Sequence, residues 1–305
     1  MARNGVEYHM ATRSSSGPEA KAAMMRRWSR HWLRSCREMP GRALAVLDRH
    51  DDDPGRQIHE FRRLMKAWRA LLKLAPIGLA EEGKAIRACA GRLRRGFGGA
   101  RDSAVIAKVL GKLCPDRAPK GDAEAAMAAA AVLMRDQGDA VRTELQRSSA
   151  AMAGWSLADE TGEFLAQAFR RSYRRARRQA RENPRCMSVE HLHDWRTTVV
   201  DLSYQLSFFA WACPARLRRQ AGMAERLRSG VGKVIDLDMV RTHLAEEALT
   251  SGGKRLAHEI ERKEARKRRR AAKLADRLLA RRPRREHADL AMALARHPPR
   301  RVSFA

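Results

Sequence analysis

The sequence predicts an all-α protein made of two pseudo-symmetric helical bundles. Three observations support this prediction. Long runs rich in Ala, Leu, Arg and Glu carry apolar residues at intervals of three and four, which is the period of an amphipathic helix. Glycine and proline gather at a few joints between these runs, and no alternating β-branched run indicates a strand. Two distant segments also recur at a fixed offset of 134 residues.

The repeat is clearest in a pair of expected helices. The first covers Ile58–Leu74, behind Asp53 as N-cap and Pro54 as first helical residue. The second covers Leu192–Phe208 and follows Ser188 in the same way. Both segments place a histidine near the start of the helix, so we expect the two helices to hold equivalent positions in their bundles.

Three identities share the offset of 134 positions: His59 with His193, Gly98 with Gly232, and Asp102 with Asp236. Gly96–Gly99 and Gly230–Gly232 are both expected to be joints between helices, and each aspartate follows one of them. Helix capping is therefore the simplest explanation for these aspartates. The two bundles are predicted over residues 18–149 and 155–282, with a disordered N-terminal segment over 1–17 and a C-terminal tail over 286–305.

The charge of the chain is strongly positive. Its 305 residues include 63 Lys and Arg against 35 Asp and Glu, a formal net charge of +28. Only 12 of the 63 are Lys, so 63 − 12 = 51 are Arg. The guanidinium group binds phosphate in a bidentate manner, so this excess favours a phosphate-rich ligand. A GC-rich coding sequence would also raise the number of arginines, but it would not explain where they are placed.

Cysteine usage and apolar runs exclude several other classes. The five cysteines are scattered, and none forms a Cys-x-x-Cys pair, so neither a disulfide framework nor a zinc site is indicated. The first twenty residues lack the apolar core of a signal peptide, and no apolar run is long enough to cross a bilayer. We therefore expect a cytoplasmic protein without a membrane partner.

One face of the Ile58–Leu74 helix carries a cationic stripe. His59, Arg62, Lys66 and Arg69 lie at i, i+3, i+7 and i+10, which places them within an arc of about 80°. Large apolar residues occupy the opposite side of the helix. A solvated face would be expected to include Glu in i,i+4 pairs, and its absence favours a binding stripe over a solvated one.

A histidine on this stripe could bind a metal, act as a catalytic base or donate to phosphate. No Cys, Asp or Glu partners stand at metal-ligand spacing. The chain also lacks a nucleophile elbow and a phosphate-cradling glycine loop followed by Lys-Ser/Thr. We therefore expect no metal, no cofactor and no catalytic residue. His59 could alternatively be a hydrogen-bonding residue in helix packing.

Two further segments concentrate positive charge. Arg170–Arg181 would open the second bundle, and Lys254–Arg285 contains 15 basic and four acidic residues. Either segment could be a solvated helix face. Both would still raise the local positive potential and help to capture a polyanion.

Together these segments resemble the conserved histidine α-helical domain, abbreviated CHAD. The family's hallmark helix has the pattern H-x-x-R-x-x-x-[KR]-x-x-R and is followed by a Gly…Arg-Asp element, which the stripe and Gly98–Asp102 match. Tyr173–Arg177 resembles the tyrosine and arginine element of the family's second copy, and His193 and Arg196 match its second hallmark helix. The chain departs from the pattern at Thr197, Thr198, Val200, Asp201 and Ser203.

The resemblance covers about residues 18–282. It implies two helical bundles whose basic faces bind inorganic polyphosphate, in a protein associated with polyphosphate granules. The candidate polyphosphate-binding residues are His59, Arg62, Arg63, Lys66, Arg69, Arg101, Arg174, Arg177, His193 and Arg196.

Two alternatives remain beside polyphosphate binding. A non-specific nucleic-acid-binding protein would need only phosphate contacts. Aromatic residues make up only 5% of the chain and mostly occupy apolar helix positions, whereas single-stranded nucleic acid sites usually add aromatic stacking. The third possibility is a polyphosphate-processing enzyme.

Overall fold

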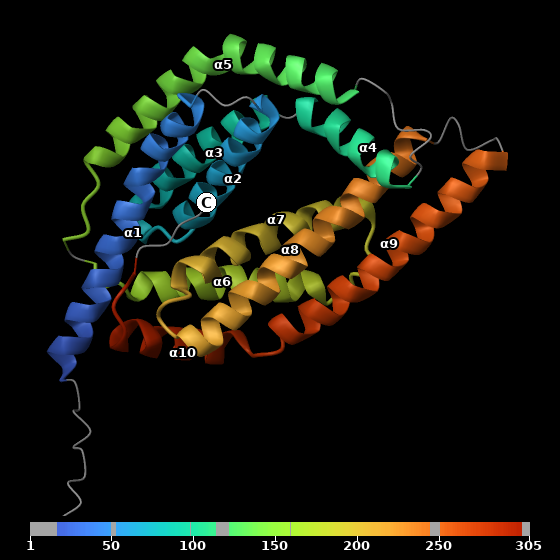
Figure 1. Ribbon diagram of the computed structural model, residues 1–305. Helices are drawn as coiled ribbons and strands as arrows, with labels where there is room; N and C mark the ends of the chain where they lie inside the picture. Colours follow the sequence, from blue (N-terminus) through green and yellow to red (C-terminus); the bar gives the residue numbers. More distant parts are fainter. Residues whose placement is uncertain are drawn as a thin grey trace, which may run out of the picture.

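The computed structural model describes residues 17–49, 53–97, 99–113, 122–158, 160–244 and 251–300. Within these ranges the chain is helical almost throughout and contains no strand, which confirms the all-α prediction (Figure 1). The helices are α1 (Pro18–Leu47), α2 (Pro54–Leu72), the short 3-10 helix η1 (Ile77–Leu79), α3 (Ala80–Gly96), α4 (Gly99–Leu113), α5 (Asp122–Ala153), α6 (Glu163–Ala180), α7 (Val189–Phe209), α8 (Pro214–His243), α9 (Ser251–Leu278) and α10 (Pro283–Arg296).

Side-chain caps set the starts of α2 and α7. The carboxylate of Asp53 accepts a hydrogen bond from the backbone N–H of Arg56 at 2.9 Å, and Pro54 occupies the first turn. The hydroxyl of Ser188 accepts from the N–H of His191 at 3.3 Å. Each cap satisfies one of the N–H groups that the first turn leaves without a helical partner. Both predicted helix starts are confirmed.

The two halves of the chain share one hydrophobic core. Its largest fully buried side chains, Trp28, Trp32, Trp68 and Trp195, come from both halves. In Figure 1, α2 and α7 lie side by side in the middle, between α5 along one edge and α9 along the other. A core built from either half of the chain alone would be small, and burying apolar surface between the halves stabilises both of them.

Polar contacts also join α2 to α7. The side-chain amide of Gln205 donates a hydrogen bond to the carbonyl of Ala70 at 3.0 Å. Lys73, at the end of α2, forms an ion pair with Asp201 of α7. The division into bundles over 18–149 and 155–282 stays a prediction.

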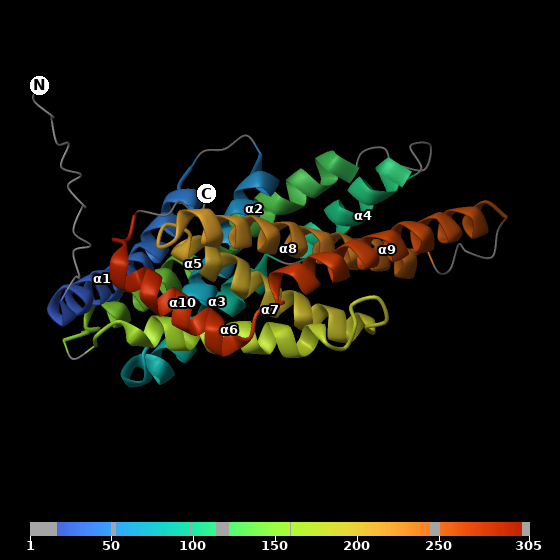
Figure 2. The ribbon, with the colours of Figure 1, turned by 90° about the horizontal axis from the view of Figure 1, so that it is seen from below.

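The prediction of a C-terminal tail over 286–305 is wrong for most of that segment. Helix α10 packs against α1 and α6 (Figure 2). Leu290 and Leu294, one turn apart, are fully buried in the main core. The carboxylate of Glu286 is also buried, and it accepts a hydrogen bond from Arg216 at 2.9 Å. This short helix is ordered because it covers a face of the bundle; residues 1–16 and 301–305 lie outside the described part of the chain.

The expected joint at Gly230–Gly232 is also wrong, because α8 continues through it to His243. Glycine weakens a helix interior by only about 1 kcal/mol relative to alanine, which packing against neighbouring helices can offset. Asp236 therefore lies inside a helix instead of at the start of one. In the first half the joint is present, since α3 ends at Gly96 and α4 begins at Gly99.

Helix α4 packs on a second, smaller apolar cluster. Leu110 lies there with Leu237 and Val240 of α8 and with Leu256 and Ile260 of α9. These residues form a group distinct from the main core. The first half of the chain thus contacts the second half both through α2 and through α4.

Candidate polyanion-binding site

The predicted cationic stripe faces α3, which runs antiparallel to α2. Near one end of this interface, Arg62 contacts the last turn of α3. Near the other end, Gly83 lies against Leu72. His59 is exposed, whereas Lys66 and Arg69 are half-buried between the helices. The structure therefore brings the stripe to a helix–helix interface instead of a fully solvated surface.

Arg62 holds the α3 C-terminus together. Its side chain is only 6% exposed, and Nη1 donates to the carbonyls of Arg94 at 2.8 Å and Phe97 at 2.6 Å. The last carbonyls of a helix have no helical donors and carry partial negative charge, so a buried guanidinium there is stabilising. Arg62 therefore lies buried under the end of α3, although helical period places it on the same stripe as His59.

Arg69 and Arg95 bring their guanidinium groups together over Gly91 of α3. A Cβ atom on Gly91 would lie 3.6 Å from Arg69 Nε and 3.6 Å from Arg95 Nη1. Arg69 Nε is buried and has no hydrogen-bond acceptor among the described residues. Neither Arg69 nor Arg95 forms an ion pair with an acidic residue in the part of the chain that the structure describes. Two cations this close repel each other, so the arrangement favours an anion between or above them.

Arg87 extends this group along α3. Burial lowers its pKa, the charge of Asp201 opposes that change, and the charge of Arg69 lowers the pKa further. We call Arg69, Arg87 and Arg95 the α2–α3 cluster. Sequence reasoning missed Arg87, Gly91 and Arg95. The signal was present, because Gly83, Arg87, Gly91 and Arg95 recur at every fourth position and therefore lie along one ridge of a helix.

Helix α7 offers fewer cations than α2. Arg196 lies against α8, and its Nη2 is 3.4 Å from the Cβ position of Gly232. His193 is exposed near the start of the helix. Asp201 and Ser203 are buried and serve packing contacts, since Asp201 pairs with Lys73 and Ser203 donates to Glu225 at 3.2 Å. Asp201 and Ser203, two of the departures from the basic pattern, therefore have structural roles.

Arg63 belongs to the junction of α2 with α7 and α8. Burial raises the pKa of Tyr204, and the charges of Arg228 and Arg63 oppose that rise. Arg63 Nε is buried without a hydrogen-bond acceptor among the described residues. Arg228 pairs with Glu225. The charge of Arg63 therefore acts at this junction, close to Tyr204.

Arg177 and Tyr173 of α6 cap the C-terminus of α9. The Tyr173 hydroxyl donates to the carbonyls of Leu278 at 3.2 Å and Arg281 at 3.3 Å, and Arg177 Nε donates to Leu279 at 2.9 Å. Burial raises the pKa of Tyr173 to about 12. Arg177 therefore stabilises the end of α9, whereas Arg174 is exposed to solvent. The side chain of Arg101 lies outside the described residues.

A family model for the CHAD domain matches residues 37–245, more than half of the chain. The chain belongs to the CHAD domain family. No curated protein matches the sequence, and neither does any solved structure. The CHAD domain is a polyphosphate-related domain, and the match ends before α9 and α10.

A second group of four neighbouring cations, three of them exposed, lies where α8 of this CHAD domain packs on α9. Burial lowers the pKa of Lys267, and the neighbouring charges of Lys233, Arg270 and Arg266 lower it further. No described acidic residue pairs with any of the four. We call them the α8–α9 cluster. The sequence indicated only a broad basic segment here, because the contribution of Lys233 depends on how α8 packs on α9.

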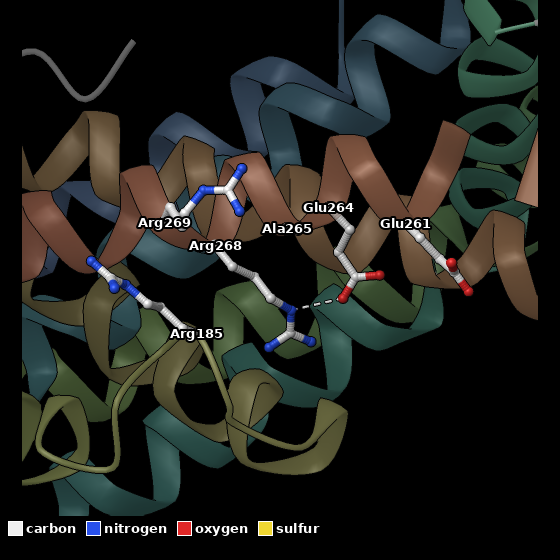
Figure 3. A pocket seen from close by; sticks show the side chains of 6 residues that line it. All are labelled: Arg185, Glu261, Glu264, Ala265, Arg268 and Arg269. Atoms are coloured by element: carbon white, nitrogen blue, oxygen red, sulfur yellow. Dashed lines mark hydrogen bonds and ion pairs between the residues drawn. The ribbon is translucent and has the colours of Figure 1, made fainter. Parts of the chain in front are cut away.

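A pocket of about 300 Å³ lies beside α9, where the loop between α6 and α7 meets it (Figure 3). Arg268 Nε donates to Glu264 at 2.7 Å, and Nη1 donates to the Met187 carbonyl at 2.8 Å. Figure 3 shows Glu261 beside this pair and Arg185 and Arg269 on the other side of the pocket. Two carboxylates offset the charge of its three arginines, so this pocket has less unpaired positive charge to offer a phosphate than the two clusters.

The described residues of the CHAD domain protein contain no group of three or more His, Cys, Asp or Glu that could hold a metal ion. Over the same residues, no helix is both long and apolar enough to cross a membrane.

Proposed function

We propose that this CHAD domain protein binds inorganic polyphosphate without catalysing a reaction on it. The observation that carries this proposal is the convergence of cations in the α2–α3 and α8–α9 clusters, where no member forms an ion pair with a described acidic residue. A polymer of phosphate groups supplies negative charge and acceptor oxygens at each cluster. His59, Lys66, Arg174, His193 and Arg196 would add contacts around them.

The chemistry of the clusters favours a phosphate polymer over single-stranded nucleic acid. Sites for single strands stack bases on aromatic side chains. The half-buried ring of Trp211 is covered by two guanidinium groups, with Arg218 3.9 Å and Arg300 5.2 Å from its centroid. The tryptophans Trp28, Trp32 and Trp68 are fully buried. These rings offer no open stacking surface, so charge and hydrogen bonding are the available modes of recognition.

We further propose that the two halves are pseudo-symmetric repeats. Helices α2 and α7 both begin at a side-chain cap and pack against each other. Arg62 contacts the Phe97 carbonyl, next to Gly98, and Arg196 lies on Gly232. These two arginines are 134 positions apart, as are the two glycines. In this proposal the repeats have diverged, with more ligand contacts in the first.

Competition between two polyanions tests the proposed ligand. The protein is bound to a labelled DNA duplex and titrated with long-chain polyphosphate, and the reverse titration is run in parallel. We expect polyphosphate to displace the duplex at a much lower phosphate concentration than the duplex needs to displace polyphosphate. Equal competition per phosphate would favour a non-specific nucleic-acid-binding protein instead.

Two experiments test the absence of catalysis and the cellular site. Incubation with long-chain polyphosphate and a divalent metal should leave the chain length unchanged, and shortening would indicate a polyphosphate-processing enzyme.

A tagged copy should gather at cytoplasmic granules only in cells that synthesise polyphosphate. An identical distribution in cells without polyphosphate would contradict granule association.

A further inference from the structure

One ridge of α3 alternates glycine and arginine where it packs on α2. At Gly83 the Cβ position would be 3.4 Å from the Ala75 Cβ and 3.6 Å from the Leu72 carbonyl, so the helices approach closely there. Two turns further along, Gly91 meets the side chain of Arg69 in place of α2 backbone. The guanidinium groups of Arg69 and Arg95 therefore lie directly over Gly91, in the space that a side chain at position 91 would enter.

The distances at Gly91 suit a single phosphate group. Arg69 Nε and Arg95 Nη1 each lie 3.6 Å from the same point, so they are separated by no more than twice that distance. A charge-assisted hydrogen bond from a guanidinium to a phosphate oxygen spans about 2.7–2.9 Å. Two oxygens of one tetrahedral phosphate can therefore accept from both arginines at once.

The rest of the interface does not satisfy these two arginines. Arg62 on the same helix donates to two carbonyls, whereas Arg69 Nε is buried without an acceptor among the described residues. Arg95 is exposed and forms no ion pair with a described acidic residue. Glu144, on α5, is already bonded to Arg147. A buried donor without an acceptor is destabilising, and an anion bound by the same guanidinium groups would offset this cost.

We propose that Arg69 and Arg95 form a clamp for one phosphate group, with Gly91 as its floor. The inference rests on the proposed function and assigns two residues to the site, Arg95 and Gly91, that the hallmark pattern of α2 does not include. Arg69 approaches from α2 and Arg95 from α3, so the clamp exists only when the two helices are packed. A side chain larger than alanine at position 91 would enter the space that the two guanidinium groups occupy and would displace them from the clamp.

The sharpest test keeps the net charge constant. Gly91→Leu should weaken the binding of long-chain polyphosphate about fivefold, because the added side chain occupies the floor of the clamp. Gly41→Leu is the matched control, since a Cβ atom at this exposed helical glycine meets nothing within 4 Å. It should bind within about twofold of the wild type. The melting temperature of each variant is measured by circular dichroism.

A double-mutant cycle provides the second test. Arg69→Gln and Arg95→Gln should each weaken binding about tenfold, and the double variant should lose little more than either alone, because both contact one phosphate. Arg92→Gln, which removes an exposed charge from the same helix, should cost about twofold or less. If Gly91→Leu melts at a lower temperature, this cycle alone decides the proposal.

The outcomes separate the clamp from the proposed function. If the wild type binds polyphosphate and a folded Gly91→Leu variant binds it with unchanged affinity, the clamp is overturned. The clamp is also overturned if the affinity losses of Arg69→Gln and Arg95→Gln multiply in the double variant. In both cases polyphosphate binding itself would stand. A wild-type protein that does not bind long-chain polyphosphate would overturn the proposed function and the clamp together.

Discussion

Arg62 donates a hydrogen bond of 2.6 Å to the carbonyl of Phe97, 35 positions downstream, and thereby closes the C-terminus of α3. The same Nη1 atom donates to Arg94. This contact couples the hallmark helix to the point where the chain turns from α3 into α4. An arginine of the hallmark pattern is therefore part of the fold.

Arg62→Ala should destabilise the protein. It removes charge-assisted hydrogen bonds from a buried helix end, and each such bond contributes about 1.5–3 kcal/mol. We expect the free energy of unfolding to fall by about 3 kcal/mol, measured by urea denaturation. Arg56→Ala, at an exposed position of the same helix, should change it by less than about 0.5 kcal/mol. Normal stability with weakened polyphosphate binding would show that Arg62 is a ligand contact instead.

Acidification should destabilise the protein through His31. The ring stacks on Phe208 and meets the edge of Trp28. Burial lowers the pKa of His31 to about 4, the charge of Arg34 lowers it too, and Glu38 opposes the change. The unfolded chain, with a pKa near 6.5, takes up a proton first as the pH falls. Stability is therefore lost between pH 6.5 and 4, by about 3 kcal/mol in total.

Unfolding curves at pH 7 and pH 4.5 measure this effect. His31→Phe keeps the aromatic packing and cannot be protonated, so its stability should fall less over the same range. An equal loss in the wild type and His31→Phe would assign the acid sensitivity to other groups.

The two hallmark helices should contribute unequally to binding. Lys66 and Arg69 of α2 correspond to Val200 and Ser203 of α7, at the offset of 134 residues. We expect Lys66→Ala combined with Arg69→Ala to weaken polyphosphate binding by tenfold or more, about 1.4 kcal/mol or above. Arg196→Ala should cost less. Titrations at fixed salt compare the variants, and a larger loss for Arg196→Ala would place the main site in the second half.

Affinity for polyphosphate should fall steeply as salt is added. Each phosphate that the protein neutralises releases condensed counterions. By analogy with nucleic acid, a site using about six phosphates should lose affinity on the order of a thousandfold between 50 and 200 mM salt. The slope of log affinity against log salt concentration measures this number, and a flat response would contradict a charge-dominated site.

The candidate site was predictable only in part. The pattern of α2 indicated a cationic stripe at His59, Lys66 and Arg69, because helical period alone places them on one face. The same period could not show that Arg62 would be buried under the end of α3, nor that Arg177 would cap α9. These roles depend on carbonyl groups that are distant in the sequence.

Local sequence determined the helical composition of this chain, the capped starts of α2 and α7, and the resemblance to the CHAD family, since period, capping and motif are properties of neighbouring residues. Tertiary structure decided the rest. In the folded protein α10 packs into the core, α8 continues without a break through Gly232, and Arg95 lies close to Arg69 over Gly91. The physical reason is that a helix presents several polar positions, and only the neighbour that packs against each one decides whether its charge is buried, capped or left for a ligand.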